Sequence, residues 1–258
     1  MAQRAVWVWD RAPAANLIRF AQSHAVQDLF LAVPDNLPSS EALPWVRAVV
    51  DAARPSSIRP HALGGDPGWI DDPAKAVNWQ RAALSTGLFV GSHVDLEAWR
   101  HPGWETDRAA TVTKYLLTLD VLAAVATVPL EADITFWLHT VLTPNGQPLD
   151  AAVLACVDRV TVMSFRNTVT GPDGITEIAA PTLAAARAAG RPVRLAVETS
   201  YLGDDPVSRK QTFYGQTSEA MFAAMARVDK VEAPNPSYAG ISVQHCAAWA
   251  AMRRERRT

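Results

Sequence analysis

The stretch Gly91–Trp99, GSHVDLEAW, contains the pattern that decides the fold of this chain. Apolar Val94 and Leu96 alternate with a histidine and two carboxylic acids, which is the period-two pattern of a β-strand. In a sheet with one face in water, these polar side chains would be exposed. In a closed barrel surrounded by helices, the apolar face packs against the helices and the polar face lines the interior. Whether the rest of the chain can form such a barrel therefore decides where this polar face lies.

Eight strand-like runs alternate with helical patterns along the whole chain. The expected strands are 5–10, 28–34, 58–66, 87–97, 133–139, 158–165, 192–200 and 238–245. The expected helices are 14–25, 40–53, 72–85, 107–126, 149–157, 176–190, 218–231 and 246–257. Eight βα units in 258 residues predict an α/β fold, a single-domain (β/α)8 TIM barrel over residues 1–258. A doubly wound open sheet is the alternative, but the turn after the first strand lacks a glycine-rich phosphate loop.

The net charge of −2 argues against general nucleic-acid binding, which requires a basic surface for the phosphates. No apolar run is long enough for a membrane span, and the N-terminus lacks the features of a signal peptide. We therefore expect a cytoplasmic protein with no nucleic-acid partner, no membrane partner and no cofactor, whereas the oligomeric state stays open. The one basic run, residues 252–258, is interpreted as the solvated end of the last helix.

The strand alternation predicts which side chains face the barrel axis or lie at its C-terminal mouth, where barrel enzymes keep their active sites. These side chains are Asp10, His61, Phe89, His93, Asp95, Glu97, Thr135, Trp137, His139, Thr161, Met163, Phe165, Glu198, Ser242 and Gln244. The first strand stays ambiguous, because its tryptophans compete with its valines for the inner face.

Two glutamates, Glu97 and Glu198, are expected to converge at this mouth from the fourth and seventh strands. Cleavage of a glycosidic bond requires two such carboxyl groups. One protonates the leaving oxygen, and the other acts as a nucleophile or as a base on water. Asp95 lies two residues deeper than Glu97 and can hold or share a proton with it, because crowding of like charges raises one pKa. The pattern indicates paired-carboxylate catalysis.

Aromatic residues near the strand ends are consistent with a sugar substrate. The chain contains nine tryptophans, and Trp99, Trp137 and Tyr201 lie at or just beyond predicted strand ends. Flat apolar rings with a polar edge suit the faces of pyranose rings. We therefore expect a small-molecule or oligosaccharide substrate.

The fourth strand resembles the signature of the family 18 glycoside hydrolases, the chitinase-like barrels, which is Asp-Gly-x-Asp-x-Asp-x-Glu. Aligned on the glutamate, Gly91, Asp95 and Glu97 match this signature, while Val90 and His93 stand in place of the two earlier aspartates. The resemblance implies that Glu97 is the acid. It also implies that Asp95 assists a mechanism driven by the N-acetyl group of the substrate.

The sixth strand adds a partial match, since VMSFR (162–166) is similar to the Met-x-Tyr-Asp motif of that family. Met163 is in place, and Phe165 and Arg166 stand where the tyrosine and the aspartate would be. The chain also resembles barrel glycosidases with an acid/base glutamate after strand four and a nucleophilic glutamate after strand seven, roles that would go to Glu97 and Glu198. Its layout is similar to uncharacterised bacterial glycosidase-like barrels.

We therefore predict a glycoside hydrolase-like enzyme that acts on a carbohydrate or glycoconjugate through Glu97, Asp95 and Glu198. The residues predicted to bind substrate are Asp10, His61, His93, Trp99, Trp137, His139, Met163, Arg166, Tyr201 and Gln244. One alternative is a metal-dependent sugar isomerase or hydrolase with ligands from the inward-facing histidines and carboxylates, although no tight motif supports a metal site. The other is a carbohydrate-binding barrel without catalysis.

Overall fold

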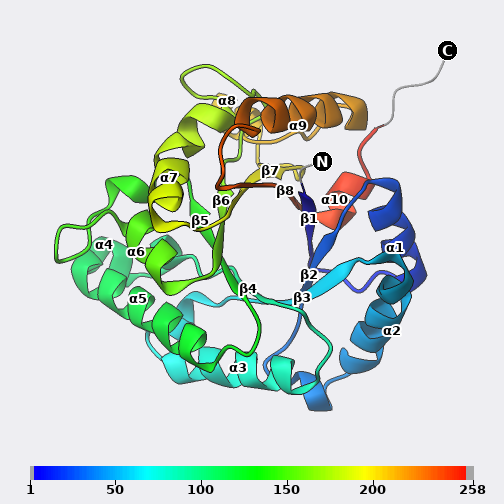
Figure 1. Cartoon of the computed structure of the whole chain (residues 1–258), viewed down its shortest axis with the longest axis horizontal. Helices are drawn as coiled ribbons and strands as arrows, with labels where there is room; N and C mark the ends of the chain where they lie inside the picture. The colour runs from blue at the N-terminus through cyan, green and yellow to red at the C-terminus, as the bar shows by residue number, and fades with distance from the viewer. Residues whose placement is uncertain (1–2, 254–258) are drawn as a thin grey trace.

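The computed structural model describes residues 3–253, which form a closed barrel of parallel strands in the order β1 to β8 (Figure 1). The strands are β1 (Gln3–Val8), β2 (Asp28–Ala32), β3 (Arg59–Gly64), β4 (Ser92–Val94), β5 (Leu130–Thr135), β6 (Arg159–Met163), β7 (Val193–Glu198) and β8 (Tyr238–Gln244). Each strand pairs with the next, and β8 pairs with β1. The closed order confirms the predicted TIM barrel and excludes the open sheet.

Helices surround the barrel on its outer side (Figure 1). They are α1 (Ala14–Ser23), α2 (Leu43–Ala53), α3 (Pro73–Ser85), α4 (Gly103–Thr106), α5 (Arg108–Val125), α6 (Leu149–Cys156), α7 (Ile175–Ala189), α8 (Pro206–Lys210), α9 (Ser218–Glu232) and α10 (Cys246–Ala250). Short 3-10 turns are η1 (Leu37–Ser39), η2 (Arg54–Ser56), η3 (Pro67–Ile70), η4 (Ala98–Arg100) and η5 (Leu138–Thr140). The last helix ends earlier than predicted, and residues 254–257 of that prediction lie outside the described residues. Within residues 3–253, no helix has the length and apolar character needed to cross a membrane.

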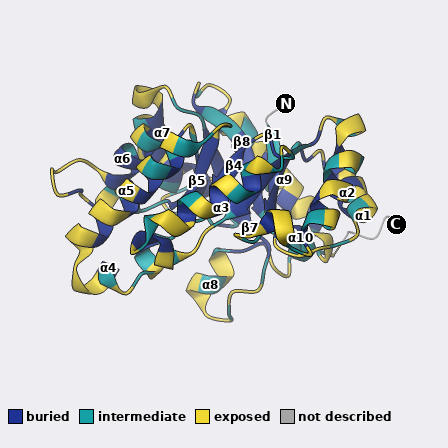
Figure 2. Ribbon diagram, turned by 90° about the horizontal axis from the view of Figure 1, so that it is seen from below, coloured by how far each residue is buried: buried dark blue, intermediate teal, exposed yellow. Residues whose placement is uncertain are grey.

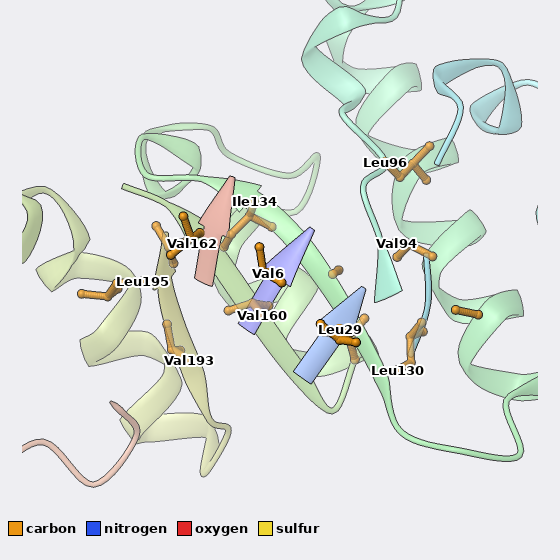
Figure 3. Close-up of a cluster of buried hydrophobic side chains, with 14 of the residues drawn as sticks. Val6, Leu29, Val94, Leu96, Leu130, Ile134, Val160, Val162, Val193 and Leu195 are labelled. Carbon is orange, nitrogen blue, oxygen red and sulfur yellow. The ribbon is translucent and has the colours of Figure 1, made fainter. Parts of the chain in front are cut away.

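The apolar positions of the strands form the layer between barrel and helices. Val94 and Leu96 are fully buried in this layer together with apolar residues of the other strands (Figure 3). Figure 2 shows the strands buried at the centre, with the exposed residues on the outer sides of the helices. Burying each such side chain contributes about 1.5–3 kcal/mol, so the apolar alternation determines which face of every strand points outward.

The first strand places its tryptophan inside, which resolves the ambiguity left by the sequence. Val6 and Val8 belong to the outer layer, whereas Trp7 packs with Phe30 and Leu63 in a separate cluster inside the barrel. The Trp7 and Phe30 rings meet edge to face, with 5.4 Å between centroids. The barrel interior therefore has an aromatic filling on this side.

The fourth and fifth strands differ most from their predicted limits. The fourth is shorter than 87–97: Phe89 packs in the outer layer, which corrects its predicted inward position, and Val90 is exposed. The fifth covers Leu130–Thr135 rather than 133–139, because the chain turns into η5 after residue 137. Glu131 and Asp133 therefore point into the barrel and are buried.

A buried ion-pair network crosses the barrel interior near the N-terminal ends of the strands, below the C-terminal mouth. The Arg194 side chain of β7 is 0% exposed, and its Nη2 donates to Asp28 Oδ2 of β2 at 2.5 Å. Its Nε lies 3.2 Å from Glu131 Oε1 of β5. Asp28 also accepts from Arg59 at 2.6 and 2.8 Å. Burial raises the pKa of both carboxyl groups, but both pKa values lie below their usual range, because the His61 hydrogen bond and then Arg194 and Arg59 outweigh burial at Asp28, and Arg194 leads the groups that outweigh it at Glu131.

We predict that Arg194→Met lowers the free energy of unfolding by about 3–5 kcal/mol, because Asp28 and Glu131 would be left buried without their shared cation. Chemical denaturation at neutral pH measures this loss. Arg191→Met is the matched control: Arg191 lies 3.4 Å from Asp158 at a partly exposed position, and its loss should cost at most about 1 kcal/mol. Equal effects of the two substitutions would contradict the assigned role of Arg194.

Candidate active site

A cavity of about 560 Å³ opens at the carboxyl ends of the strands. It is lined by Trp7, Trp9, Gly65, Pro67, Asp95, Glu97, Arg100, Asp133, Met163, Phe165, Glu198, Leu202 and Gln244. Four of these residues carry carboxyl groups, and they come from β5, from the end of β7 and from the segment that follows β4. The structure thus brings Asp95, Glu97, Glu198, Met163 and Gln244 of the predicted site into one cavity.

Glu97 lies at the mouth, where the chain leaves β4 and enters η4. Its Oε2 accepts a hydrogen bond from Arg100 Nη1 at 2.9 Å. The Glu97 side chain is 19% exposed and that of Arg100 is 70% exposed. The cation therefore covers the carboxylate from the solvent side, where a bound molecule could displace it.

Asp95 lies one strand step deeper than Glu97 and is held by the neighbouring β3 segment. Its backbone N–H donates to the Gly64 carbonyl at 2.9 Å, which continues the β3–β4 ladder. Any side chain at Gly65 would place its Cβ 2.1 Å from the Asp95 carbonyl oxygen. Glycine is therefore required at that position, because the β3–η3 segment passes directly against the backbone of Asp95.

Asp95 shares the floor of the cavity with Asp133 of β5. Asp133 is 1% exposed, and its Oδ2 accepts from the Trp7 indole N–H at 3.0 Å. The Oδ1 atoms of both aspartates are buried without a hydrogen-bond partner among the described residues. Burial, followed by the nearby carboxylates, raises the pKa of each aspartate well above its usual value.

His93 lies beneath the two aspartates and is fully buried. Its Nε2 lies 2.8 Å from Asp133 Oδ2 and its Nδ1 lies 3.9 Å from Glu131 Oε1, without hydrogen-bond geometry. Its ring stacks on Phe30 at 3.8 Å between centroids. Burial lowers the pKa of His93 to about 4, against the opposing effect of the carboxylates, so the ring is uncharged at neutral pH. His93 is thus part of the support below the cavity and does not line it.

Glu198 approaches from the end of β7 and is nearly buried. Its Oε1 accepts the backbone N–H groups of Thr199 and Ser200, both at 2.7 Å. Burial raises the pKa of Glu198, and these backbone donors oppose the shift. One carboxylate oxygen is therefore fixed by the backbone turn after β7.

Aromatic and apolar side chains form the walls between the carboxyl groups. Trp9 is 43% exposed at the rim, and its indole N–H donates to Gln244 Oε1 at 3.3 Å. Phe165 and Met163 follow from β6, and Leu202 follows from the segment after β7. The cavity therefore combines acidic groups with flat apolar surfaces.

Two predicted tryptophans do not line this cavity. Trp99 and Trp137 contact each other with 5.7 Å between ring centroids and pack against the outer layer of the core. His139 lies in η5, where its Nδ1 is 3.0 Å from the Phe136 carbonyl oxygen. The predicted inward strand positions of Trp137 and His139 are wrong, because β5 ends at Thr135, before either residue.

Four further residues of the predicted site also lie outside the cavity. His61 is deeper, at 3.0 Å from Asp28 Oδ1. Arg166 pairs with Asp173 at 2.8 Å. Asp10 is exposed just beyond β1. Tyr201 lines a separate pocket of about 400 Å³ beside α10. Strand alternation alone predicts neither how deep each of these side chains lies nor which residue it contacts.

Several lining residues were not predicted, and one of them carries a carboxyl group. A strand over 133–139 makes Asp133 its first residue, although the alternation in LEADIT (130–135) puts residues 131 and 133 on the inner face. The first strand does not decide between its tryptophans and its valines, and Arg100 belongs to η4, which has no strand alternation. Residues 3–253 contain no group of three or more His, Cys, Asp or Glu side chains arranged to hold a metal ion.

No family model matches the sequence. No curated protein matches it in sequence either. Solved structures of similar fold include a GH18 chitinase from Pseudoalteromonas aurantia, with a TM-score of 0.62 and 13% identity over 96% of this chain and 95% of that one. A chitinase from Chromobacterium violaceum gives a TM-score of 0.61 and 12% identity over 97% and 98% of the two chains. The spore cortex-lytic enzyme SleL from Bacillus megaterium gives 0.60 and 10% identity over 100% of this chain and 75% of that one. In fold, the chain is a TIM barrel similar to those of the GH18 chitinases.

Proposed function

We propose that this protein hydrolyses a glycosidic bond of a carbohydrate or glycoconjugate in the cavity at the barrel mouth. The observation that carries the proposal is that the carboxyl groups of Asp95, Glu97, Asp133 and Glu198 line one cavity whose walls include aromatic rings. Most enzymes that hydrolyse this bond use paired carboxyl groups, and aromatic rings pack well against sugar rings. The similarity in fold to chitinases supports this class of reaction.

In this proposal Glu97 donates the proton to the leaving oxygen. Among His93, Asp95 and Glu97, it lies nearest the solvent. Its partner Arg100 is exposed, so a sugar that enters can displace it. Asp95 lies beneath Glu97, and burial followed by the nearby carboxylates raises its pKa, which favours its protonated form. Asp95 is thus a proton source beneath Glu97, and Glu97 is the proton donor at the mouth of the cavity.

Glu198 supplies the second carboxyl group. Its Oε1 is oriented by the backbone, so its other oxygen is the one presented to a bound molecule. Phe165 has no hydroxyl group where the chitinase-like motif has a tyrosine. We therefore favour activation of water or direct attack by Glu198 over assistance from an N-acetyl group.

We predict that Glu97→Gln lowers turnover of a susceptible glycan by about 10²–10⁴-fold without loss of folded protein, because the amide cannot donate a carboxyl proton. The measurement is release of reducing ends from a glycan panel that includes N-acetylglucosamine oligomers. Glu105→Gln, at a side chain that is 79% exposed, is the control and should leave turnover unchanged. Sugar binding by the unaltered protein without turnover of any glycan would indicate a binding protein instead of an enzyme.

We predict a comparable loss of turnover for Glu198→Gln, because the amide can neither attack the sugar nor accept a proton from water. The backbone donors of Thr199 and Ser200 can still bind the amide oxygen, so the loop after β7 should stay in place. Thermal unfolding of the variant checks this. Full activity of Glu198→Gln would leave Glu97 and Asp95 as the catalytic carboxyl groups and would remove Glu198 from the mechanism.

A further inference from the structure

The floor of the cavity holds two carboxyl groups from neighbouring strands. Asp133 of β5 is 1% exposed, and Asp95 directly follows β4. Both line the same cavity, and in each of them Oδ1 is buried without a hydrogen-bond partner among residues 3–253. Buried polar atoms are nearly always hydrogen-bonded, so two such atoms at one place require a specific explanation.

No cation in the described structure neutralises this pair. The guanidinium group of Arg194 faces Glu131 and Asp28 below it, and that of Arg100 pairs with Glu97 above it. His93 lies against Asp133 but is uncharged at neutral pH.

The other groups that face the pair carry no positive charge either. Glu97 adds a negative charge from the mouth, and Glu131 adds one from below. The hydroxyl group of Tyr115 of α5 is fully buried, and burial raises the pKa of that group above its usual value. The Trp7 N–H on Asp133 and the more distant charge of Arg100 oppose the desolvation and repulsion of the pair but do not outweigh them, so the two neighbouring carboxyl groups are not both ionised.

We propose that Asp133 is the proton-sharing partner of Asp95, so that the two carboxyl groups hold at least one proton between them at neutral pH. Asp133 is a positioning residue in this arrangement. Its Oδ2 is fixed by the Trp7 indole N–H, which leaves Oδ1 as the oxygen available to Asp95. The shared proton keeps Asp95 a hydrogen-bond donor beneath Glu97. This last consequence rests on the proposed function, whereas the proton-sharing pair does not.

Carbon-13 NMR of protein with labelled aspartate carboxyl groups tests the pair without any substrate. In the unaltered protein we expect Asp95 and Asp133 to titrate in two steps separated by more than about one pH unit. In Asp133→Asn, Asp95 should titrate in one step that lies between these two, because one like charge is gone. The reciprocal variant Asp95→Asn should leave a single step for Asp133.

Asp51→Asn is the matched control, because Asp51 is exposed and contacts only Arg54 among the ion pairs of the described residues. It should leave both titration steps of the pair unchanged. Titration of Asp95 near its ordinary value in the unaltered protein, or an Asp95 titration that Asp133→Asn does not alter, overturns the proposal. Because this readout needs no turnover, a protein without glycosidase activity can still possess the pair, and the two proposals fail separately.

Thermal stability gives a second test with a defined sign. The raised pKa of Asp133 means that its ionisation is disfavoured in the folded state, so its cost to stability sets in as pH rises above about 4, the value in the unfolded chain. Asparagine can still accept from Trp7 but cannot ionise. We therefore expect the Tm of Asp133→Asn minus the Tm of the unaltered protein to increase from pH 4 to pH 8, as measured by circular dichroism. A difference independent of pH would contradict the proposal.

Discussion

The interior of this barrel depends on one buried cation. Since helices cover the outer face of every strand, each polar side chain that points inward must find its partner inside the barrel. Arg194 of β7 provides this partner for Asp28 of β2 and Glu131 of β5. These three strands are not neighbours in the barrel, so the ion pairs connect parts of the wall that share no backbone hydrogen bonds. Many barrels fill this space with branched apolar side chains, and here charge compensation takes that place.

The ion pairs of Arg194 beneath the cavity determine the electrostatics at the cavity floor. Arg194 pairs with Asp28 and Glu131, so its charge does not compensate Asp95 and Asp133 at the floor of the cavity. The uncharged His93 ring separates the two levels. The interior is therefore layered, with ionised and paired groups at the bottom, carboxyl groups of raised pKa in the middle, and Glu97 with Arg100 at the mouth. His93 occupies the place of an aspartate in the chitinase-like signature, and the acid beside it comes from β5 instead.

Much of the barrel and part of the cavity could be predicted from the sequence. In a strand beside a helix layer, the apolar positions face the helices, so the alternate positions face inward. Asp95 and Glu198 lie in the cavity for this reason. The end of β5 could not be predicted, since the apolar alternation continues through Phe136 and Leu138 into η5, where the backbone no longer follows the barrel wall. The assignment of Trp137 to the site failed at this point.

The sequence by itself determined the eight βα units and the direction in which the polar face of GSHVDLEAW points, because both follow from local periodicity. Only the tertiary structure decided which inward-facing groups meet. The contact of Asp133 with Trp7 joins residues 126 positions apart, and that of Arg194 with Asp28 joins residues 166 positions apart. Such contacts depend on the register and closure of the whole barrel, and no local pattern encodes them. The charge state of the cavity follows from these long-range contacts.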